Sequence, residues 1–167
     1  MEYTFRICQE ADANNVLEFL SGIQNEGLLT ITKMARLPSV VEESMWIKSH
    51  TENGYIECCC YNGTIVGLIN AKRLMPSELN HNLFLSLSVL KDHRKNGIAS
   101  LLIKNLLEWS RKNNVQRIEL DVFGNNARAI NFYYKVGFVV DGNRKMAVKL
   151  HNGEFVDLIH MSMTIAQ

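Results

Sequence analysis

The sequence predicts an α/β fold in which a mixed, mostly antiparallel sheet of six or seven strands carries helices on both faces. A β-α-β unit between Leu83 and Phe123 predicts one parallel pair of strands at the centre of that sheet. Asn-Gly pairs at 62–63 and 152–153 each join two strand-like runs, and this dipeptide is the strongest short signal for an antiparallel hairpin. We expect all 167 residues to form one domain, because no linker-like stretch divides the chain.

The N-terminal half predicts three strands and two helices. The strands are Tyr3–Cys8, Tyr55–Tyr61 and Thr64–Ala71. Asp12 is placed to cap the first helix. Ser39 and Glu42 form a capping box, which predicts a second helix that runs to about Ser49. Between these helices, residues 22–37 show no clear periodicity.

The C-terminal half predicts further strands and two more helices. The strands are Leu83–Val89, Arg117–Phe123, Phe138–Val140, Met146–Leu150 and Glu154–Ile165. Apolar residues recur at three- and four-residue spacing from Ile98 to Trp109, which predicts a helix. Asn126 is well placed as the N-cap of a short helix over Ala127–Val136, which Gly137 ends. Asp141-Gly142 predicts a turn.

The loop Arg94-Lys95-Asn96-Gly97-Ile98-Ala99 joins a strand to a helix and is suited to binding phosphate. The first N–H groups of a helix lack partners within the helix, and its dipole makes that end positive. Gly97 and the small Ala99 allow a ligand to approach the backbone, while Arg94, Lys95 and Lys104 add positive charge. The loop therefore predicts a diphosphate site at the start of a helix.

The composition narrows the class of protein. With 47% hydrophobic and 21% charged residues, it is typical of a soluble globular domain. Lys and Arg number 18 against 17 for Asp and Glu, whereas a nucleic-acid-binding surface usually leaves a larger basic excess. No apolar run reaches membrane-spanning length, and the first residues lack the order of a signal peptide. We therefore expect a cytoplasmic protein that binds neither nucleic acid nor membrane.

The four cysteines are Cys8 and the consecutive Cys58, Cys59 and Cys60. Consecutive strand residues point to opposite faces, so this run cannot converge on one metal ion without breaking the strand. No Cys-x-x-Cys or Cys/His ligand spacing accompanies it. We expect small apolar packing residues in a reducing compartment, and no metal site.

Two motifs together resemble the GNAT superfamily of acetyl-CoA-dependent N-acetyltransferases. Arg94-x-x-Gly97-x-Ala99 after an apolar strand resembles the family's pyrophosphate loop. Asn126-x-x-Ala129-Ile130-x-x-Tyr133-x-x-x-Gly137-Phe138 follows about thirty residues later and resembles the family's next helix and strand. The resemblance is specific over Leu83 to Phe138. It implies that the central parallel strands splay apart, and that residues 22–49 contribute one wall of the acceptor site.

The resemblance also implies how acetyl-CoA, the acetyl donor, is bound, with its pantetheine arm between the splayed strands. The implied donor-binding residues are Leu87, Ser88, Val89, Arg94, Lys95, Asn96, Gly97, Ile98, Ala99, Ser100, Asn126 and Tyr133. Tyr133 matches the tyrosine that protonates the leaving CoA thiolate in the family. Its ordinary pKa of about 10 suits a donor that is protonated at neutral pH. The alternative for Tyr133 is an aromatic ring that only packs on the sheet.

A carboxylate on the strand before Asn126 could remove the proton of the amine. Asp121 lies where some family members that acetylate protein N-termini carry a glutamate, and Glu119 shares its face of the strand. Charged residues seldom lie on a strand that is buried on both faces, so these two need an explanation. The alternative is that both reach solvent at the splayed edge and have no catalytic role.

The sequence therefore predicts an N-acetyltransferase that moves acetyl from acetyl-CoA to a primary amine by direct attack in a ternary complex. One alternative acceptor is the N-terminal amine of a peptide or ribosomal protein. A different class of protein, a non-catalytic acyl-CoA-binding module, would need neither Tyr133 nor the acidic strand. A nucleotide-binding protein is disfavoured because neither G-x-G-x-x-G nor the Walker pattern is present. Long C-terminal hairpin strands with apolar residues on more than one face favour a homodimer.

Overall fold

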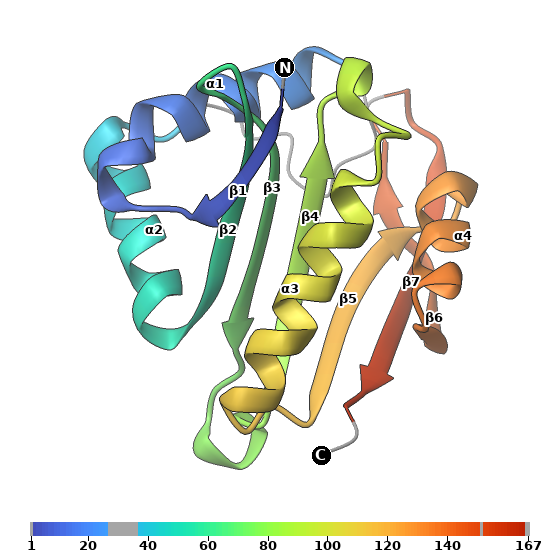
Figure 1. The fold of residues 1–167 in the computed structure, drawn as a ribbon. Helices are drawn as coiled ribbons and strands as arrows, with labels where there is room; N and C mark the ends of the chain where they lie inside the picture. The colour runs from blue at the N-terminus through green and yellow to red at the C-terminus, as the bar shows by residue number, and fades with distance from the viewer. Residues whose placement is uncertain (1, 27–36, 151, 166–167) are drawn as a thin grey trace.

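The computed structural model describes residues 2–26, 37–150 and 152–165. In this part of the chain, seven strands form one sheet in the order β1-β2-β3-β4-β5-β7-β6, with four α-helices around it (Figure 1). The strands are β1 (Tyr3–Ile7), β2 (Gly54–Tyr61), β3 (Thr64–Arg73), β4 (Asn82–Val89), β5 (Arg117–Phe123), β6 (Val139–Lys149) and β7 (Phe155–Thr164). The helices are α1 (Ala13–Asn25), α2 (Val40–Asn53), α3 (Ile98–Lys112) and α4 (Ala127–Lys135).

The strand directions confirm the predicted mixed sheet. β4 and β5 are parallel, and every other pair of neighbouring strands described is antiparallel. β4 and β5 can be parallel because α3 crosses over the sheet between them (Figure 1). The strand order places this pair in the interior of the sheet.

Helices cover both faces of the sheet, as predicted (Figure 1). On one face, Leu102 and Leu106 of α3 are buried in a core that includes Ile69 of β3. On the other face, Phe19 of α1 and Ile47 of α2 belong to a second core over β2 and β3. Burying one such side chain stabilises the fold by roughly 1.5–3 kcal/mol, so these two cores fix the helices to the sheet.

Local signals at the hairpin and the capping box are confirmed. Asn62 and Gly63 both have positive φ, 50° and 83°, as a two-residue hairpin turn with the favoured twist requires. The Ser39 hydroxyl accepts a hydrogen bond from the Glu42 amide at 3.3 Å, and the Glu42 carboxylate accepts one from the Ser39 amide at 2.7 Å. The helix that this box starts extends beyond its predicted end to Asn53.

The prediction that Asp12 caps the first helix with its side chain is wrong. Asp12 does precede α1, but its carboxylate makes no cap hydrogen bond to that helix. It accepts hydrogen bonds from the Arg6 guanidinium at 2.7 and 2.8 Å and from the Gln9 amide at 2.8 Å. The strong charged donor Arg6 takes the oxygens that a cap would have used.

The predicted turn at Asp141-Gly142 is also wrong, because both residues lie inside the single long strand β6. The register of β6 against β7 shifts between Val140 and Gly142, and again between Arg144 and Val148. An extra residue in one strand bends it without ending it. The Asp141 carboxylate is held by Arg117 and by the Ser162 hydroxyl at 2.7 Å, so it fits on the sheet surface.

The cysteine run alternates between the two faces, as predicted for a strand. Cys59 lies in the core beneath α3, whereas Cys58 and Cys60 lie in the core beneath α1 and α2. Met161 of β7 is fully buried in the α3 core. Most of the segment without clear periodicity, residues 27–36, lies outside the described residues.

Candidate functional site

The central parallel strands separate part-way along their length. Their pairing is confined to Asn82–Phe84 of β4 with Arg117–Glu119 of β5. β4 nevertheless stays paired to β3 as far as Val89. The C-terminal parts of β4 and β5 therefore diverge, which confirms the splay that the sequence resemblance implied.

A cavity of about 620 Å³ lies at this splay. Consecutive residues of β4 from Phe84 to Val89 line it, and such residues point alternately to the two faces of a sheet. Tyr133 of α4 lines it from the face that α3 and α4 cover, and Leu20 of α1 lines it from the other face. The cavity therefore reaches both faces of the sheet through the gap between β4 and β5.

Most residues that the sequence assigned to the site meet at this cavity. Its wall includes Leu87, Ser88, Val89, Arg94, Lys95, Gly97, Ile98, Ala99, Ser100, Asp121, Asn126 and Tyr133. Asn96 does not line it, since its side-chain amide donates to the Tyr3 hydroxyl and the His93 carbonyl, each at 3.2 Å. Lys104 does not line it either and lies 3.8 Å from Glu108. Asn96 and Lys104 are therefore not part of the cavity wall.

The loop before α3 presents backbone N–H groups to one end of the cavity. Gly97 is the N-cap of α3 with a φ of 78°, a left-handed conformation that glycine adopts readily. The first hydrogen bond of the helix runs from the Leu101 amide to the Gly97 carbonyl at 3.0 Å, so the amides of residues 98–100 precede it. A Cβ on Gly97 would have no protein atom within 4 Å. This open space over unpaired donors suits an anionic group.

The Arg94 side chain is engaged in contacts that stabilise the loop before α3, so its positive charge is already paired. Its Nε donates to the Val89 carbonyl at 2.9 Å, and its guanidinium forms an ion pair with Glu26 at the end of α1. The Glu26 carboxylate also accepts a hydrogen bond from the Lys91 amide at 2.6 Å. These contacts tie the loop before α3 to α1 and fix its position.

Arg128 is a cavity residue that sequence reasoning missed. Burial and the neighbouring Arg94 guanidinium lower the pKa of Arg128, so the two positive charges lie close together. Such an arrangement favours a bound anion beside Arg128. The signal in the sequence was its place in the first turn of α4, two residues after the Asn126 cap.

Tyr133 is held rigidly at the wall of the cavity. It is 8% exposed, and its ring lies 5.4 Å from the Phe132 ring and 5.5 Å from the Phe138 ring, centroid to centroid. Burial raises the pKa of Tyr133, which keeps the hydroxyl protonated at neutral pH, and no side chain in the described ranges is hydrogen-bonded to it. The Asn126 side chain accepts from the Ala129 amide at 3.2 Å and so caps α4, as predicted.

Asp121 lines the cavity from β5, on the face opposite the apolar residues Leu120 and Val122. Its carboxylate accepts a hydrogen bond from Arg144 of β6 and lies 2.8 Å from Nδ1 of His160 of β7. Asp121 is therefore oriented from two sides. Glu119 does not line the cavity, and its carboxylate lies 3.1 Å from the Arg117 Nε.

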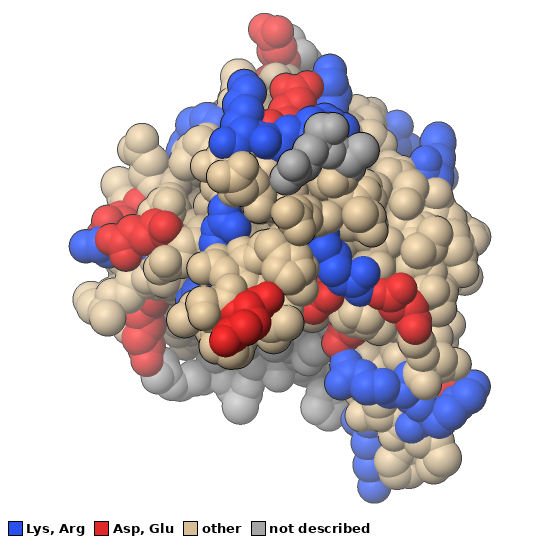
Figure 2. All heavy atoms as spheres, turned by 90° about the horizontal axis from the view of Figure 1, so that it is seen from below, with Lys and Arg blue, Asp and Glu red and all other residues tan. Residues whose placement is uncertain are grey.

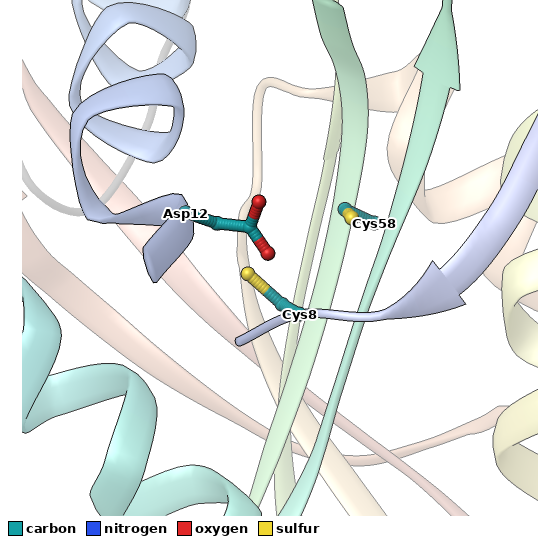
Figure 3. A group of neighbouring side chains, drawn as sticks. All are labelled: Cys8, Asp12 and Cys58. Carbon is teal, nitrogen blue, oxygen red and sulfur yellow. The ribbon is translucent and has the colours of Figure 1, made fainter. Parts of the chain in front are cut away.

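One group of potential metal ligands lies elsewhere, in the core beneath α1 and α2. Cys8, Asp12 and Cys58 point toward one another (Figure 3), with one ligand atom of each within 4.8 Å of the others. The Asp12 oxygens already accept hydrogen bonds from Arg6 and Gln9. The hydrogen bond with Cys8, together with burial, raises the pKa of the Cys58 thiol, which disfavours the thiolate that a metal needs. The group fits buried packing better than metal binding.

Charged side chains of both signs are mixed on the surface that Figure 2 shows. Seen from below in Figure 2, Lys and Arg side chains lie among Asp and Glu side chains, without one continuous basic surface on the described part of that face. Among the described residues, no helix has the length and apolar character that crossing a membrane requires.

Comparison with known proteins identifies relatives along most of the chain. A model of the acetyltransferase (GNAT) family matches residues 26–138. The L-amino acid N-acetyltransferase of Escherichia coli is 35% identical over 107 residues, which cover 62% of this chain and 64% of that protein. The match therefore spans less than two thirds of that relative.

Two solved structures share the fold along nearly the whole chain. A GNAT-family acetyltransferase from Streptococcus pneumoniae has a TM-score of 0.90 at 25% identity and covers 98% of this chain and 100% of its own. A phosphinothricin acetyltransferase from Sinorhizobium meliloti, solved in complex with acetyl-CoA, has a TM-score of 0.85 at 19% identity and covers 99% of this chain and 90% of its own.

Proposed function

The chain belongs to the GNAT family of acetyltransferases, and from this premise we propose that it transfers the acetyl group of acetyl-CoA to the primary amine of a small molecule. The observation that carries the proposal is the cavity at the splayed ends of β4 and β5, which reaches both faces of the sheet. Donor and acceptor can meet there from opposite sides. Holding both in one complex supplies much of the rate, and no covalent enzyme intermediate is needed.

Acetyl-CoA enters from the face of α3 and α4. Its diphosphate binds the amides of residues 98–100, and Arg128 adds charge at the same end of the cavity. The pantetheine arm lies along β4, whose edge toward β5 has no strand partner beyond Phe84. Backbone groups there can bond the amides of the arm as a neighbouring strand would. The acetyl-CoA bound to the Sinorhizobium meliloti relative supports the same donor here.

Starting from the ammonium form, transfer requires two protons to leave the acceptor nitrogen and one proton to reach the leaving group. The acceptor ammonium gives its first proton to Asp121, and the freed nitrogen lone pair attacks the thioester carbonyl carbon. The tetrahedral intermediate collapses, the carbon–sulfur bond breaks, and the CoA thiolate takes the proton of the Tyr133 hydroxyl. The nitrogen, now part of the amide, gives up its second proton to solvent, and Tyr133 regains a proton from solvent. Tyr133 and Asp121 suit these roles because they line the same cavity from opposite faces of the sheet.

An L-amino acid is the acceptor class that we favour. The Escherichia coli relative is an L-amino acid N-acetyltransferase, which supports this choice. The Asp121 carboxylate and the Arg144 guanidinium form an ion pair beside the cavity. An amino acid zwitterion carries the complementary charges, so its ammonium can meet Asp121 while its carboxylate meets Arg144. A peptide N-terminus lacks the adjacent carboxylate.

We also propose that two copies of the chain form a homodimer. β6 is at the edge of the sheet and exposes Val139, Val140 and Met146. Unpaired edge strands with apolar side chains are usually covered, and a second copy of the chain is a common cover. Light scattering should give about twice the 19.1 kDa of one chain, whereas a mass of one chain would reject the dimer.

Release of free CoA thiol tests the proposed activity. The protein is mixed with acetyl-CoA and, in turn, with L-amino acids, their methyl esters, simple alkylamines and short peptides. We expect thiol release with amino acids to exceed release with peptides, and mass spectrometry should find an N-acetyl product. Binding of acetyl-CoA with no thiol release for any amine would instead support the non-catalytic acyl-CoA-binding module.

A further inference from the structure

A polar network lies on β5, β6 and β7, on the face of the sheet opposite Tyr133. At its centre, His160 Nδ1 is 2.8 Å from Asp121 Oδ1, and His160 Nε2 is 3.7 Å from Glu119 Oε2. The imidazole therefore bridges two carboxylates, one of which lines the cavity. Its side chain is 28% exposed, so it also reaches solvent.

The charges of the described network do not balance when the imidazole is neutral. Three carboxylates, Glu119, Asp121 and Asp141, face two guanidiniums, Arg117 and Arg144. The difference is 3 − 2, one negative charge. Each guanidinium is already paired, Arg117 with both Glu119 and Asp141, and Arg144 with Asp121. A proton on the imidazole would supply the missing positive charge.

Histidine is the member of this network whose ordinary pKa lies nearest neutral pH. The hydrogen bond from Arg117 lowers the pKa of Asp141, and the Ser162 hydroxyl donates to the same carboxylate at 2.7 Å, so this carboxyl favours its charged form. The guanidiniums remain charged because their pKa values lie far above neutral. The imidazole, which lies between two carboxylates, is therefore the group in this network that is suited to hold one more proton.

We propose that His160 holds the proton that the acceptor amine loses, with Asp121 as the link between the amine and the imidazole. This inference rests on the proposed function. The ammonium N–H bond breaks, and its proton passes to the Asp121–His160 pair as the nitrogen lone pair is freed. The product is an imidazolium whose Nδ1–H faces Asp121 and whose Nε2–H faces Glu119, and it releases the proton to solvent after transfer.

His160 acts through Asp121 and is therefore a positioning residue rather than a catalytic one. The competing explanation is that His160 only orients the carboxylate. His160→Asn separates the two, because an asparagine amide can still donate to Asp121 but cannot hold a second proton. A purely orienting role predicts the same loss of rate at every pH. A proton-holding role predicts a loss that depends on pH.

The experiment measures kcat against pH for wild type, His160→Asn and His160→Gln, with saturating acetyl-CoA and the L-amino acid that the panel acetylates fastest. At about pH 7 we expect kcat of His160→Asn to be about 10–100-fold below wild type. The ratio of the wild-type kcat to the His160→Asn kcat should shrink as pH rises toward the pKa of the amine itself, because the free amine then needs no acceptor for its proton. A constant ratio across the pH range would overturn the proposal.

Glu119→Gln is a second test that leaves His160 in place, should both His160 variants fail to fold. Removing the charge 3.7 Å from Nε2 disfavours the imidazolium. In Glu119→Gln, the acidic limb of the profile of kcat against pH should therefore lie at lower pH than in wild type. An acidic limb at the same pH in both proteins would count against the proposal. If no amine in the panel releases CoA, the proposed function itself fails. If transfer occurs and neither pH effect is found, only the role of His160 fails.

Discussion

Asp121 and Tyr133 line one cavity from opposite faces of the sheet, Asp121 on β5 and Tyr133 on α4. The splay of β4 from β5 makes this possible, because it opens a path through a sheet that strand pairing would otherwise close. A proton acceptor and a proton donor on opposite sides of a reacting carbon match the needs of a direct transfer. The two residues also lie in different surroundings, since Asp121 contacts the polar side chains of Arg144 and His160 and Tyr133 packs among apolar side chains.

The backbone of Gly97 is predicted to be essential for binding CoA. Gly97→Val places a β-branched side chain where φ is 78° and where the diphosphate lies in our account. Calorimetry should find CoA affinity reduced at least about tenfold, the loss expected for one good charge-assisted contact. Gly63→Val is the matched control, because Gly63 has a φ of 83° and similar open space but lies in a hairpin turn away from the cavity. An unchanged CoA affinity in folded Gly97→Val would show that the loop is not the diphosphate site.

Arg128 is predicted to contribute a charge to the donor site. Arg128→Gln should raise the Kd for CoA by about 10–150-fold, since a hydrogen bond to a charged group contributes about 1.5–3 kcal/mol. The loss should diminish at high salt, where the charge is screened. Lys112→Gln, at the far end of α3, removes an exposed positive charge outside the cavity and serves as the control. If Arg128→Gln and Lys112→Gln raise the Kd for CoA equally, Arg128 acts only through the overall charge of the protein and not through a contact in the donor site.

Arg144 is predicted to select acceptors that carry a carboxylate. Arg144→Gln should raise KM for L-amino acids by about tenfold and change KM for their methyl esters much less, because an ester has no charge for the guanidinium. Lys145→Gln is the neighbouring control, since Lys145 lies 2.7 Å from Asp157 instead of Asp121. If amino acids and esters lose affinity equally, Arg144 acts only by holding Asp121.

The buried carboxyl of Glu57 is predicted to make stability fall with rising pH. Burial raises the pKa of Glu57, although the Tyr55 hydroxyl and the Asn105 amide each donate to it at 2.8 Å. The folded protein thus holds this proton more tightly than the unfolded chain. Its contribution is greatest below the unfolded pKa of about 4.3 and declines as pH rises through the higher folded value.

Glu57→Gln removes this pH dependence and keeps a side chain of the same shape. The stability of the variant relative to wild type should therefore increase from about pH 4.3 upward in urea unfolding experiments. Glu78→Gln, on an exposed turn, should change little at any pH. A relative stability of Glu57→Gln that stays constant or falls with pH would contradict the assignment.

Much of the fold could be predicted because local signals agreed with the tertiary structure. The Asn62-Gly63 turn, the Ser39 capping box and the strand over Arg117–Phe123 each depend on neighbouring residues, and each was confirmed. The Asp12 and Asp141 predictions failed for one reason. Each carboxylate is held by an arginine that is distant in sequence or in an earlier strand, and such partners override local turn and cap preferences.

The donor half of the candidate site was easier to predict than the acceptor half. Gly97, Asn126 and Tyr133 belong to motifs in which spacing along the chain fixes position. Arg144 and His160 reach Asp121 only because β7 lies between β5 and β6 in the sheet, an order that the sequence does not reveal. Their roles depend on strand register, so they could be found only from the structure.

The measurement that tests the central claim most directly is a single turnover of acetyl transfer by Tyr133→Phe. The ring and its packing on Phe132 and Phe138 remain, and only the hydroxyl is lost, so folding and acetyl-CoA affinity should change little. The rate of CoA release with an amino acid acceptor should fall by about one hundred to ten thousand fold, the usual range for losing one proton-transfer group. A single turnover avoids product release, which could mask the chemical step in steady state. A folded Tyr133→Phe variant that releases CoA at the wild-type rate would contradict the account.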